Sequence, residues 1–390
     1  MEELEKIDNE QVIDTEDTSS GKEPITHPFN PNDIDIVTPP FTVGNLIDRM
    51  QYAEINMNTD FQREGNLWKE DKQSRLIESI LLGLPLPAFY FDTMNPQWDI
   101  VDGLQRCCSI ENFCVKKTLR LTGLEFLGEK DGEPYLDGLG FDDLDRIMQR
   151  NIIMHPITAH LIKRAHRSIR FILFKRLNTG GLELTPQEIR NAVYQGKAAD
   201  TIKHMAKLEE FKNATGWKIP VDRMQDRDFV SRFIAFYLIN YANYQPGLDD
   251  FINSSMELLE KTNVQPLESD FKRSLQFAVE IFGNDAFRRR INREDNRRPI
   301  NKAYFEVISV SFAKLTNTEE NSVRDNCELF KDNLITLMNS SRYSNALSRG
   351  TGTKDSVTIR FSWFQQVLQK SMNGIKIKVS DDNKIENFEL

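Results

Sequence analysis

Five consecutive residues have side chains suited to holding a phosphate group. They are Asp102-Gly103-Leu104-Gln105-Arg106, directly after the short apolar run 98–101, which is typical of a strand. A glycine at a strand-to-helix turn lets backbone amides approach a ligand, and a helix N-terminus favours an anion. Arg106 can bond a phosphate through its planar guanidinium, Gln105 can hold a phosphate oxygen or a water, and Asp102 can bind magnesium. The alternative is an ordinary turn followed by a solvated arginine.

Three other segments carry polar residues that suit the same chemistry. One ends an expected strand, the second opens an expected helix, and the third is a glycine-containing stretch before a capped helix. An ordinary loop between two helices is the simpler interpretation of the third. With Gly103, these segments give the predicted nucleotide- or phosphate-binding residues Gln62, Arg63, Lys72, Arg75, Asn178, Thr179 and Gly181, beside the predicted catalytic residues Asp102, Gln105 and Arg106.

The elements that must position these residues follow from apolar spacing and turn residues. Helices are predicted over 41–52 with Thr42 as N-cap, over 68–82, and over 104–115. Strands are predicted over 55–61, 88–91 and 98–101, and two weaker patterns indicate strands within 119–127 and 152–162. Thr185-Pro186-Gln187-Glu188 has the form of a capping box and predicts a helix that runs to about Gln195.

After residue 196 the strand signals fade and helical spacing dominates. Helices are predicted over 200–213, 226–242, 250–261, 268–283, 300–315, 322–339 and 360–371. The first 35 residues hold eleven Asp or Glu and two Lys, which accounts for the whole net charge of −9. We therefore expect a disordered acidic tail over 1–35, a mixed α/β domain over 36–196 and a helical domain over 197–390, an α+β fold overall.

Several motifs in order resemble the N-terminal domain family of GmrSD-type restriction endonucleases, which is itself similar to the ParB and sulfiredoxin folds. They are Phe61-Gln62-Arg63 with Trp68, 75–80, Pro85-Leu86-Pro87, 102–106, 176–181 and Glu188-Ile189-Arg190-Asn191. The resemblance covers about 40–190 and continues more weakly through 227–229, 301–306 and 348–351. It implies a ParB-like domain that binds and often hydrolyses a nucleoside triphosphate, with or without Mg²⁺, in bacterial restriction of phage DNA.

Two departures from the family pattern bear on activity. The family's central motif is usually D-G-Q-Q-R, and Leu104 replaces its first glutamine, which puts hydrolysis in doubt more than binding. DNA cutting in two-part members belongs to a histidine-rich HNH domain, whereas this chain has five histidines and none after His204. We interpret His155, His160 and His166 as structural residues. We expect no resident metal and no nuclease module, so DNA would be reached through a separate effector or partner.

Composition limits the remaining function classes. The sequence has no apolar run long enough to span a membrane, no secretory leader, and four cysteines without a C-x-x-C pair, so a cytoplasmic protein is expected. Six arginines within 288–298 form either a nucleic-acid patch, with Arg288, Arg289, Arg290 and Arg293 as its centre, or a set paired with nearby acids. The alternatives to a nucleotide-dependent defence protein are a ParB-like DNA-binding protein or nuclease and a non-catalytic scaffold.

Overall fold

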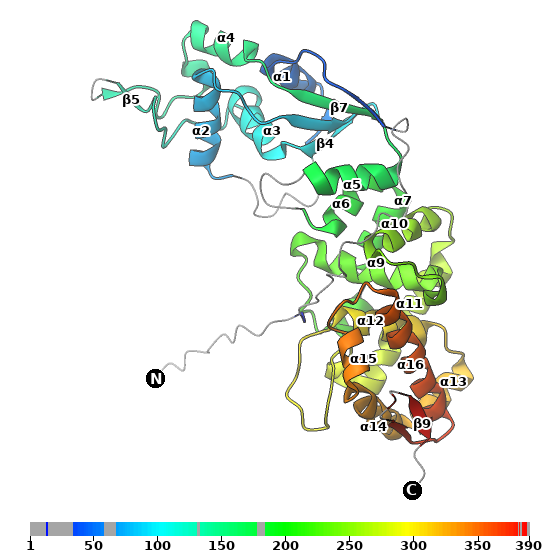
Figure 1. Ribbon diagram of the computed structural model, residues 1–390. Helices are drawn as coiled ribbons and strands as arrows, with labels where there is room; N and C mark the ends of the chain where they lie inside the picture. Colours follow the sequence, from blue (N-terminus) through cyan, green and yellow to red (C-terminus); the bar gives the residue numbers. More distant parts are fainter. Residues whose placement is uncertain are drawn as a thin grey trace, which may run out of the picture. The chain divides into compact units, whose positions relative to one another are not determined.

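The computed structural model describes residues 13–14, 34–57, 68–130, 133–177, 184–380, 382 and 384–387 (Figure 1). The chain divides into two compact units. The N-terminal unit is Pro28–Val193, and the C-terminal unit combines Met1–His27 with Tyr194–Leu390. A sheet with covering helices in the first unit and a mostly helical second unit make the fold class α+β, as predicted.

A mixed five-stranded sheet organises the N-terminal unit. Its strands, in the spatial order β1-β7-β3-β4-β2, are β1 (Asp35–Val37), β7 (Ala159–Arg164), β3 (Phe89–Asp92), β4 (Trp98–Asp102) and β2 (Ile55–Asn56). β7 and β3 are parallel, as are β4 and β2, whereas β1 with β7 and β3 with β4 are antiparallel. The strand β4, beside the central strand β3, ends at Asp102, so the sheet fixes where the candidate phosphate motif begins.

Helices pack around this sheet and complete its apolar core. They are α1 (Val43–Gln51), α2 (Glu70–Leu81), α3 (Leu104–Ile110), which continues as the π-helical turn η2 (Glu111–Val115), η3 (Phe141–Asp143), α4 (Arg146–Met154), α5 (Arg167–Leu177) and α6 (Pro186–Val193). Thr42 caps α1, because Asn45 N donates to its hydroxyl at 3.3 Å and Thr42 N donates to the Asn45 side chain at 3.0 Å. The predicted N-cap of this helix is therefore confirmed.

Of the two weak strand predictions in this unit, the first is wrong and the second is confirmed only in its last part. Residues 119–127 run as bends and extended chain, because the Glu78 carboxylate, not a neighbouring strand, accepts the backbone amides of 125–127 at 2.7–3.0 Å. The first part of 152–162 is the end of α4, and the strand β7 begins only at Ala159. A short hairpin of β5 (Glu129–Lys130) and β6 (Glu133–Pro134) was not predicted.

The C-terminal unit is built from helices and a terminal hairpin. Its longer helices are α7 (Lys197–Met205), α8 (Glu209–Ala214), α9 (Gln225–Leu238), α10 (Leu248–Leu259), α11 (Val264–Phe282), α12 (Lys302–Ala313), α13 (Asn317–Asp325), α14 (Cys327–Met338), α15 (Ser341–Ala346) and α16 (Lys354–Met372). Three short turns, η4 (Asp222–Met224), η5 (Tyr241–Asn243) and η6 (Gly283–Asp285), link some of them, and β8 (Ile377–Val379) pairs with β9 (Ile385–Asn387). The helices predicted over 200–213 and 322–339 are each divided in two.

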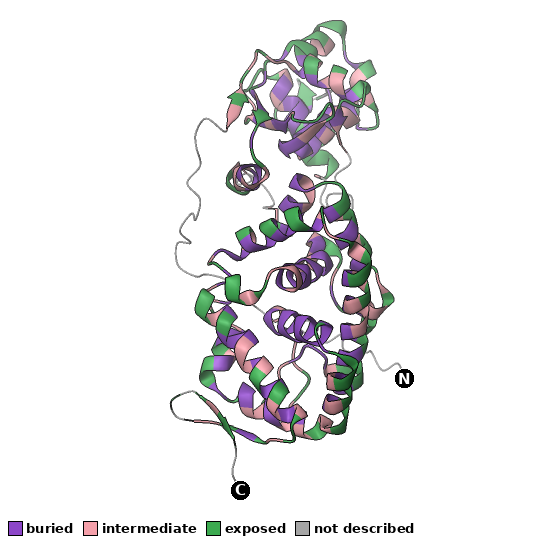
Figure 2. Cartoon of the chain, turned by 90° about the vertical axis from the view of Figure 1, so that its right-hand side faces the viewer, coloured by how far each residue is buried: buried purple, intermediate pink, exposed green. Residues whose placement is uncertain are grey.

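The core of this unit forms around α9 and α12. All residues from Ala303 to Ala313 of α12 are buried, and most of them are apolar (Figure 2). Aromatic rings fill the space between the helices, with Phe305 in edge-to-face contact with Phe211 and Phe229 at 5.9 and 5.1 Å between centroids. This packing gives the unit a core of its own.

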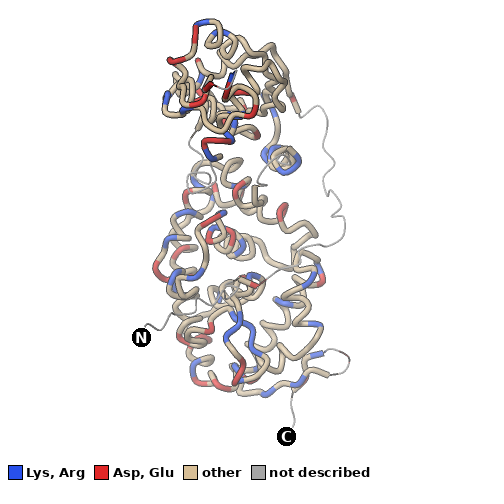
Figure 3. The backbone as a smooth tube through the Cα atoms, turned by 90° about the vertical axis from the view of Figure 1, so that its left-hand side faces the viewer, with Lys and Arg blue, Asp and Glu red and all other residues tan. Residues whose placement is uncertain are grey.

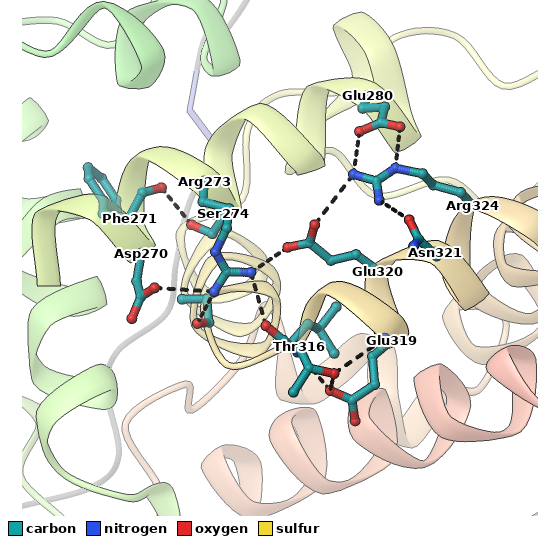
Figure 4. Close-up of polar contacts among 12 residues, drawn as sticks. Asp270, Phe271, Arg273, Ser274, Glu280, Thr316, Glu319, Glu320, Asn321 and Arg324 are labelled. Carbon is teal, nitrogen blue, oxygen red and sulfur yellow. Dashed lines mark hydrogen bonds and ion pairs between the residues drawn. The ribbon is translucent and has the colours of Figure 1, made fainter. Parts of the chain in front are cut away.

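Ion pairs join neighbouring helices near the surface of the same unit. The Glu320 carboxylate on α13 lies between Arg273 of α11 and Arg324, and Arg324 also donates to Glu280 at 2.6 Å (Figure 4). Thr316 and Glu319 form the capping box that begins α13 (Figure 4). These contacts fix α13 against α11 and show how this unit uses charged side chains for packing.

Candidate functional site

The candidate site is the corner at which β4 becomes α3. β4 ends at Asp102, Gly103 adopts φ +105° and ψ 9°, and α3 begins at Leu104. A Cβ on residue 103 would lie 2.7 Å from Cδ1 of Phe89, a distance that real Cβ atoms essentially never show. Glycine is therefore required twice at this position, for its backbone conformation and for the close approach of β3.

The buried side chain of Arg106 stabilises this corner through several hydrogen bonds. Its guanidinium donates to the backbone carbonyls of Pro87 and Ala88, the latter at 3.2 Å, and to Oδ2 of Asp102 at 3.0 Å. It also lies over the Phe89 ring, 4.4 Å from the centroid, and the residue is only 8% exposed. These contacts tie the start of β3 to the end of β4, so in this state the guanidinium holds the corner together.

Asp102 presents a carboxylate at the open side of the corner. Its side chain keeps 28% of its accessible surface although Oδ2 pairs with Arg106. Within the described residues, the other carboxylate oxygen accepts no hydrogen bond. The carboxylate is therefore oriented by one oxygen and has the second oxygen available to a ligand, a water or a cation.

Gln105 links the corner to the start of α2. Its side-chain oxygen accepts the backbone amide of Trp68 at 2.9 Å. The Gln73 side chain then donates to the Trp68 carbonyl at 2.7 Å and accepts from the Asn112 side chain at 3.0 Å. Gln105 thus positions the chain that enters α2. Sequence reasoning did not assign Gln73 or Asn112 to the site, and the available signal was a polar residue on a helix that packs against the core.

The two basic residues predicted on α2 go to different places. The Lys72 ammonium lies 4.5 Å from the centroid of the Trp68 ring, so it contacts the residue that Gln105 holds. Arg75 instead donates to the Gly123 carbonyl at 3.3 Å and pairs with Glu125 at 3.1 Å. The structure brings Lys72 and Gln105 to one segment and directs Arg75 to the loop 123–125.

The remaining predicted contacts cannot be placed at the corner. Gln62, Arg63, Asn178, Thr179 and Gly181 lie outside the described residues. The helices on either side of 178–183 are described: α5 contacts β4, and α6 begins with the predicted capping box, in which Thr185 N donates to Glu188 at 2.6 Å. Glu188 is 1% exposed, so its first role is to begin this helix.

The comparisons with known proteins concern this same part of the chain. Residues 43–195 match the family model described as GmrSD restriction endonuclease, N-terminal domain. This segment belongs to that family. No curated protein and no solved structure matches the chain significantly. The similarity of the GmrSD-type domain to ParB and sulfiredoxin folds therefore stays a prediction.

One further pair in the GmrSD-type domain was missed from the sequence. Arg170 of α5 donates to the Asp92 carboxylate at 2.6 Å, and Asp92, at the end of β3, is 3% exposed. Asp92 also accepts the amide of Met94 at 3.1 Å. The available signals were the position of Asp92 at the end of an aromatic strand and the position of Arg170 between apolar residues of a helix. The pair anchors α5, whose end leads into the segment 178–181.

The cysteines that follow the motif belong to the interior of the GmrSD-type domain. Burial raises the pKa of the Cys107 thiol well above its usual range, and it raises the pKa of Cys108 to about 11 and that of Cys114 to about 12. Thiols held in the protonated form are poor nucleophiles and poor metal ligands. We therefore interpret all three as packing residues.

The three histidines that we interpreted as structural either bond a hydroxyl group or are buried. His160 bonds the Thr38 hydroxyl at 2.8 Å, His166 bonds Ser168 at 2.9 Å, and burial lowers the pKa of His155. Among the described residues there is no group of three or more His, Cys, Asp or Glu side chains arranged to hold a metal ion. In the same part of the chain, no helix combines the length and apolarity needed to cross a bilayer.

The arginine cluster of the C-terminal unit is paired with other protein groups. Arg289 pairs with Asp14 at 2.5 Å, Arg290 with Asp285, and Arg293 with Glu328 at 2.7 Å, while Arg288 donates to the Arg298 carbonyl. Acidic and basic residues are interspersed along the backbone of this unit (Figure 3). A cavity of about 280 Å³ beside the cluster has Asp285 and Glu328 among its lining residues. The contacts favour the internally paired alternative over a nucleic-acid patch.

The weaker motif segments of the C-terminal unit meet in its interior. Lys302 pairs with Asp228 at 2.8 Å, and the fully buried Arg360 pairs with Glu306 and donates to the Thr351 carbonyl at 2.6 Å. One side chain or backbone group from each of the three motif segments therefore takes part in this buried polar network. A paired and hydrogen-bonded arrangement of this kind fixes helix positions, so we interpret these motifs as packing residues.

Proposed function

We propose that the GmrSD-type domain binds a nucleoside triphosphate at the β4–α3 corner and acts in a restriction or anti-phage defence system. The observation that carries this proposal is the glycine-only turn, which leads into a helix N-terminus that has no side-chain cap. Backbone amides at such a terminus are natural donors to a phosphate. The family match supplies the restriction context for residues 43–195.

The residues at the corner fit a phosphate with three separate roles. Gly103 makes the turn that begins α3, and the first amides of α3 donate to the phosphate. Arg106, whose donors already hold Asp102 and the start of β3, is best described as a positioning residue that adds positive charge nearby. Gln105 holds Trp68 and thereby the chain that follows the Gln62-Arg63 segment.

Hydrolysis, where it occurs, would depend on Asp102. Its second carboxylate oxygen can orient a water or share a magnesium ion with the phosphates, and its first oxygen is fixed by Arg106. Magnesium, when bound with the nucleotide, would neutralise developing phosphate charge. Leu104 has no polar group that could take part in this chemistry, and its side chain is 6% exposed and packs in the apolar core.

Calorimetric titration of the full chain with each nucleoside triphosphate and magnesium tests the proposal. Arg106→Ala should lower affinity by up to about a hundredfold, because it removes positive charge near the phosphate and the bonds that position Asp102 and β3. The upper value is that of a direct hydrogen bond to a charged group, about 1.5–3 kcal/mol. Asp102→Asn should retain binding and lose turnover. Arg75→Ala is the matched control, since Arg75 contacts the loop 123–125, and its affinity should stay unchanged.

Melting curves of the same variants separate a lost ligand contact from a damaged fold. Arg106→Lys keeps the charge but cannot bond three acceptors at once, so it should be intermediate between the wild type and Arg106→Ala in stability and affinity. A wild-type protein that binds no nucleoside triphosphate would refute the proposal. Unchanged affinity in a folded Arg106→Ala protein would remove Arg106 from the site.

We assign DNA cleavage to a separate effector. The histidines all lie at or before position 204, so residues 205–390 offer no histidine for an HNH-type centre. The purified chain should therefore leave modified and unmodified DNA intact in magnesium or manganese. Cleavage by highly pure protein, lost in Asp102→Ala, would favour the direct nuclease alternative instead.

A further inference from the structure

Two residues near the start of the sequence pair with the rest of the C-terminal unit through an isolated β-bridge. Ile13 pairs in parallel with Ile300, and the Asp14 amide donates to the Ile300 carbonyl at 2.9 Å. Ile300 also pairs antiparallel with Arg288, and Asn301 N donates to the Phe287 carbonyl at 3.0 Å. The backbone at Ile300 thus pairs on one side with the nearby residue Arg288 and on the other side with Ile13, as in peptide recognition by strand addition.

The Asp14 carboxylate meets two donors that are held in place. Its Oδ2 accepts from Arg289 at 2.5 Å and from the Asn301 side chain at 3.1 Å. Asn301 is fully buried, caps α12 by accepting the Tyr304 amide at 2.8 Å, and donates to the Leu347 carbonyl at 2.8 Å. Because Asn301 is fixed by these other bonds, the carboxylate site is part of the C-terminal fold.

Arg289 differs from its two neighbours in where its partner comes from. Arg288 and Arg290 bond acceptors within the segment 285–298. Side chains alternate along an extended chain, so Arg289 faces the other way. In the part of the chain that the structure describes, Asp14 is the polar group that Arg289 contacts. Of these three consecutive arginines, Arg289 is therefore the one whose partner lies outside the segment, and that partner is an acid 275 positions earlier.

We propose that Ile300, Arg289 and Asn301 form a docking site for an extended acidic segment with an apolar residue followed by aspartate. The chain's own N-terminal segment occupies this site intramolecularly, through Ile13 and Asp14. The backbone bonds to Ile300 select an extended conformation, and the Arg289–Asn301 pair selects a carboxylate. When the internal occupant is weakened, the site accepts such a segment from solution. This docking site lies in the C-terminal unit and is independent of the proposed nucleotide site.

A fluorescent peptide with the sequence of residues 8–19 is the probe, and the receptor is the full chain carrying Ile13→Ala and Asp14→Ala. An internal segment competes at a millimolar effective concentration. The double variant should therefore bind the peptide at least about tenfold more tightly than the wild type in an anisotropy titration. A peptide with Asp14→Asn should bind about ten- to a hundredfold more weakly, because a charge-assisted bond is lost.

Variants of the receptor decide whether the site is the one described. Arg289→Ala in the double variant should abolish peptide binding, whereas Arg293→Ala should leave it unchanged, since Arg293 pairs with Glu328 and Asp332 instead. Melting curves establish that each variant is folded. Absence of saturable binding to the folded double variant, or equal binding after Arg289→Ala, overturns the proposal. A wild-type protein that is dimeric by light scattering, and monomeric after Asp14→Ala, would show that a second copy supplies the segment and overturn internal occupancy.

Discussion

Replacing Leu104 by glutamine restores the residue that the GmrSD family usually has at this position, and the structure predicts that the protein loses stability. Leu104 is 6% exposed and lies in the same apolar core as Phe89 and Ile110. Removing a buried leucine side chain costs about 2 kcal/mol of burial. Leaving an amide buried without a partner costs about 1–3 kcal/mol more. The expected loss is therefore about 3–5 kcal/mol.

Differential scanning calorimetry and a turnover assay measure this prediction together. In a unit the size of Pro28–Val193, the loss corresponds to a decrease in Tm of roughly 6–20 °C. Nucleotide affinity and kcat should change little at a temperature where both proteins are folded. Leu104→Met, which conserves volume, should cost less than about 1.5 kcal/mol. Leu84→Gln makes the same chemical change at a residue that is 48% exposed, and should cost less than about 0.5 kcal/mol.

An unchanged Tm together with a raised kcat in Leu104→Gln would refute this reasoning. It would mean that the amide reaches the open side of the corner and acts in the transition state, as the family motif implies. A lowered Tm with unchanged kcat would establish Leu104 as a packing residue. The two outcomes differ in both measured quantities, so neither can be mistaken for the other.

Three further predictions follow from the same domain. Gly103→Ala should destabilise the domain by more than the roughly 1–2 kcal/mol that alanine costs at positive φ, because its Cβ would also meet Phe89. Gly138→Ala is the control, since Gly138 has φ +85° and an added Cβ there would meet no atom within 4 Å, so it should cost only that amount in urea unfolding. Equal losses in the two variants would contradict the Phe89 contact. Burial alone would raise the pKa of Glu78, but its bonds to three backbone amides and the charge of Arg75 outweigh burial and lower it. Glu78→Gln should therefore be less stable than wild type at pH 7, and the difference should shrink as the pH falls below 4.5 through the lowered pKa; a difference that does not shrink as the pH is lowered would contradict this. Cys114, which is buried, and Cys108, which is half-buried, both have raised pKa values and should react slowly with thiol reagents at pH 8 in the native protein and quickly after denaturation, as counted by mass spectrometry; rapid native labelling of Cys114 would contradict its burial.

The local elements around the candidate site were predictable because their signals are local. Thr42 and Thr185 begin helices through side-chain bonds to residues three positions away, and Gly103 marks its turn by its type alone. The order of strand, glycine and helix at 98–104 needs no distant contact to be recognised. Local chemistry therefore sufficed for the corner itself.

The predictions that failed concern residues whose partners lie far away along the chain. The stretch 119–127 is apolar enough for a strand, yet its amides are taken by Glu78, about fifty positions earlier. The direction of Arg75 depends on the same loop, and Arg106 turns inward because the carbonyls of Pro87 and Ala88 are there to receive it. No spacing rule contains these positions, so a basic residue near a phosphate motif could not be assigned a target from sequence.

The pairing of Ile13 with Ile300 has a consequence for how the protein is made. Asn301 lies 287 positions after Asp14, and a ribosome adding about 5–20 residues per second needs about 15–60 s to synthesise that stretch. Throughout this time the strand partner of Ile13 does not exist, while the whole of Pro28–Val193 emerges and can fold. The segment at Ile13 is therefore translated long before its partner and is among the last to find its native place.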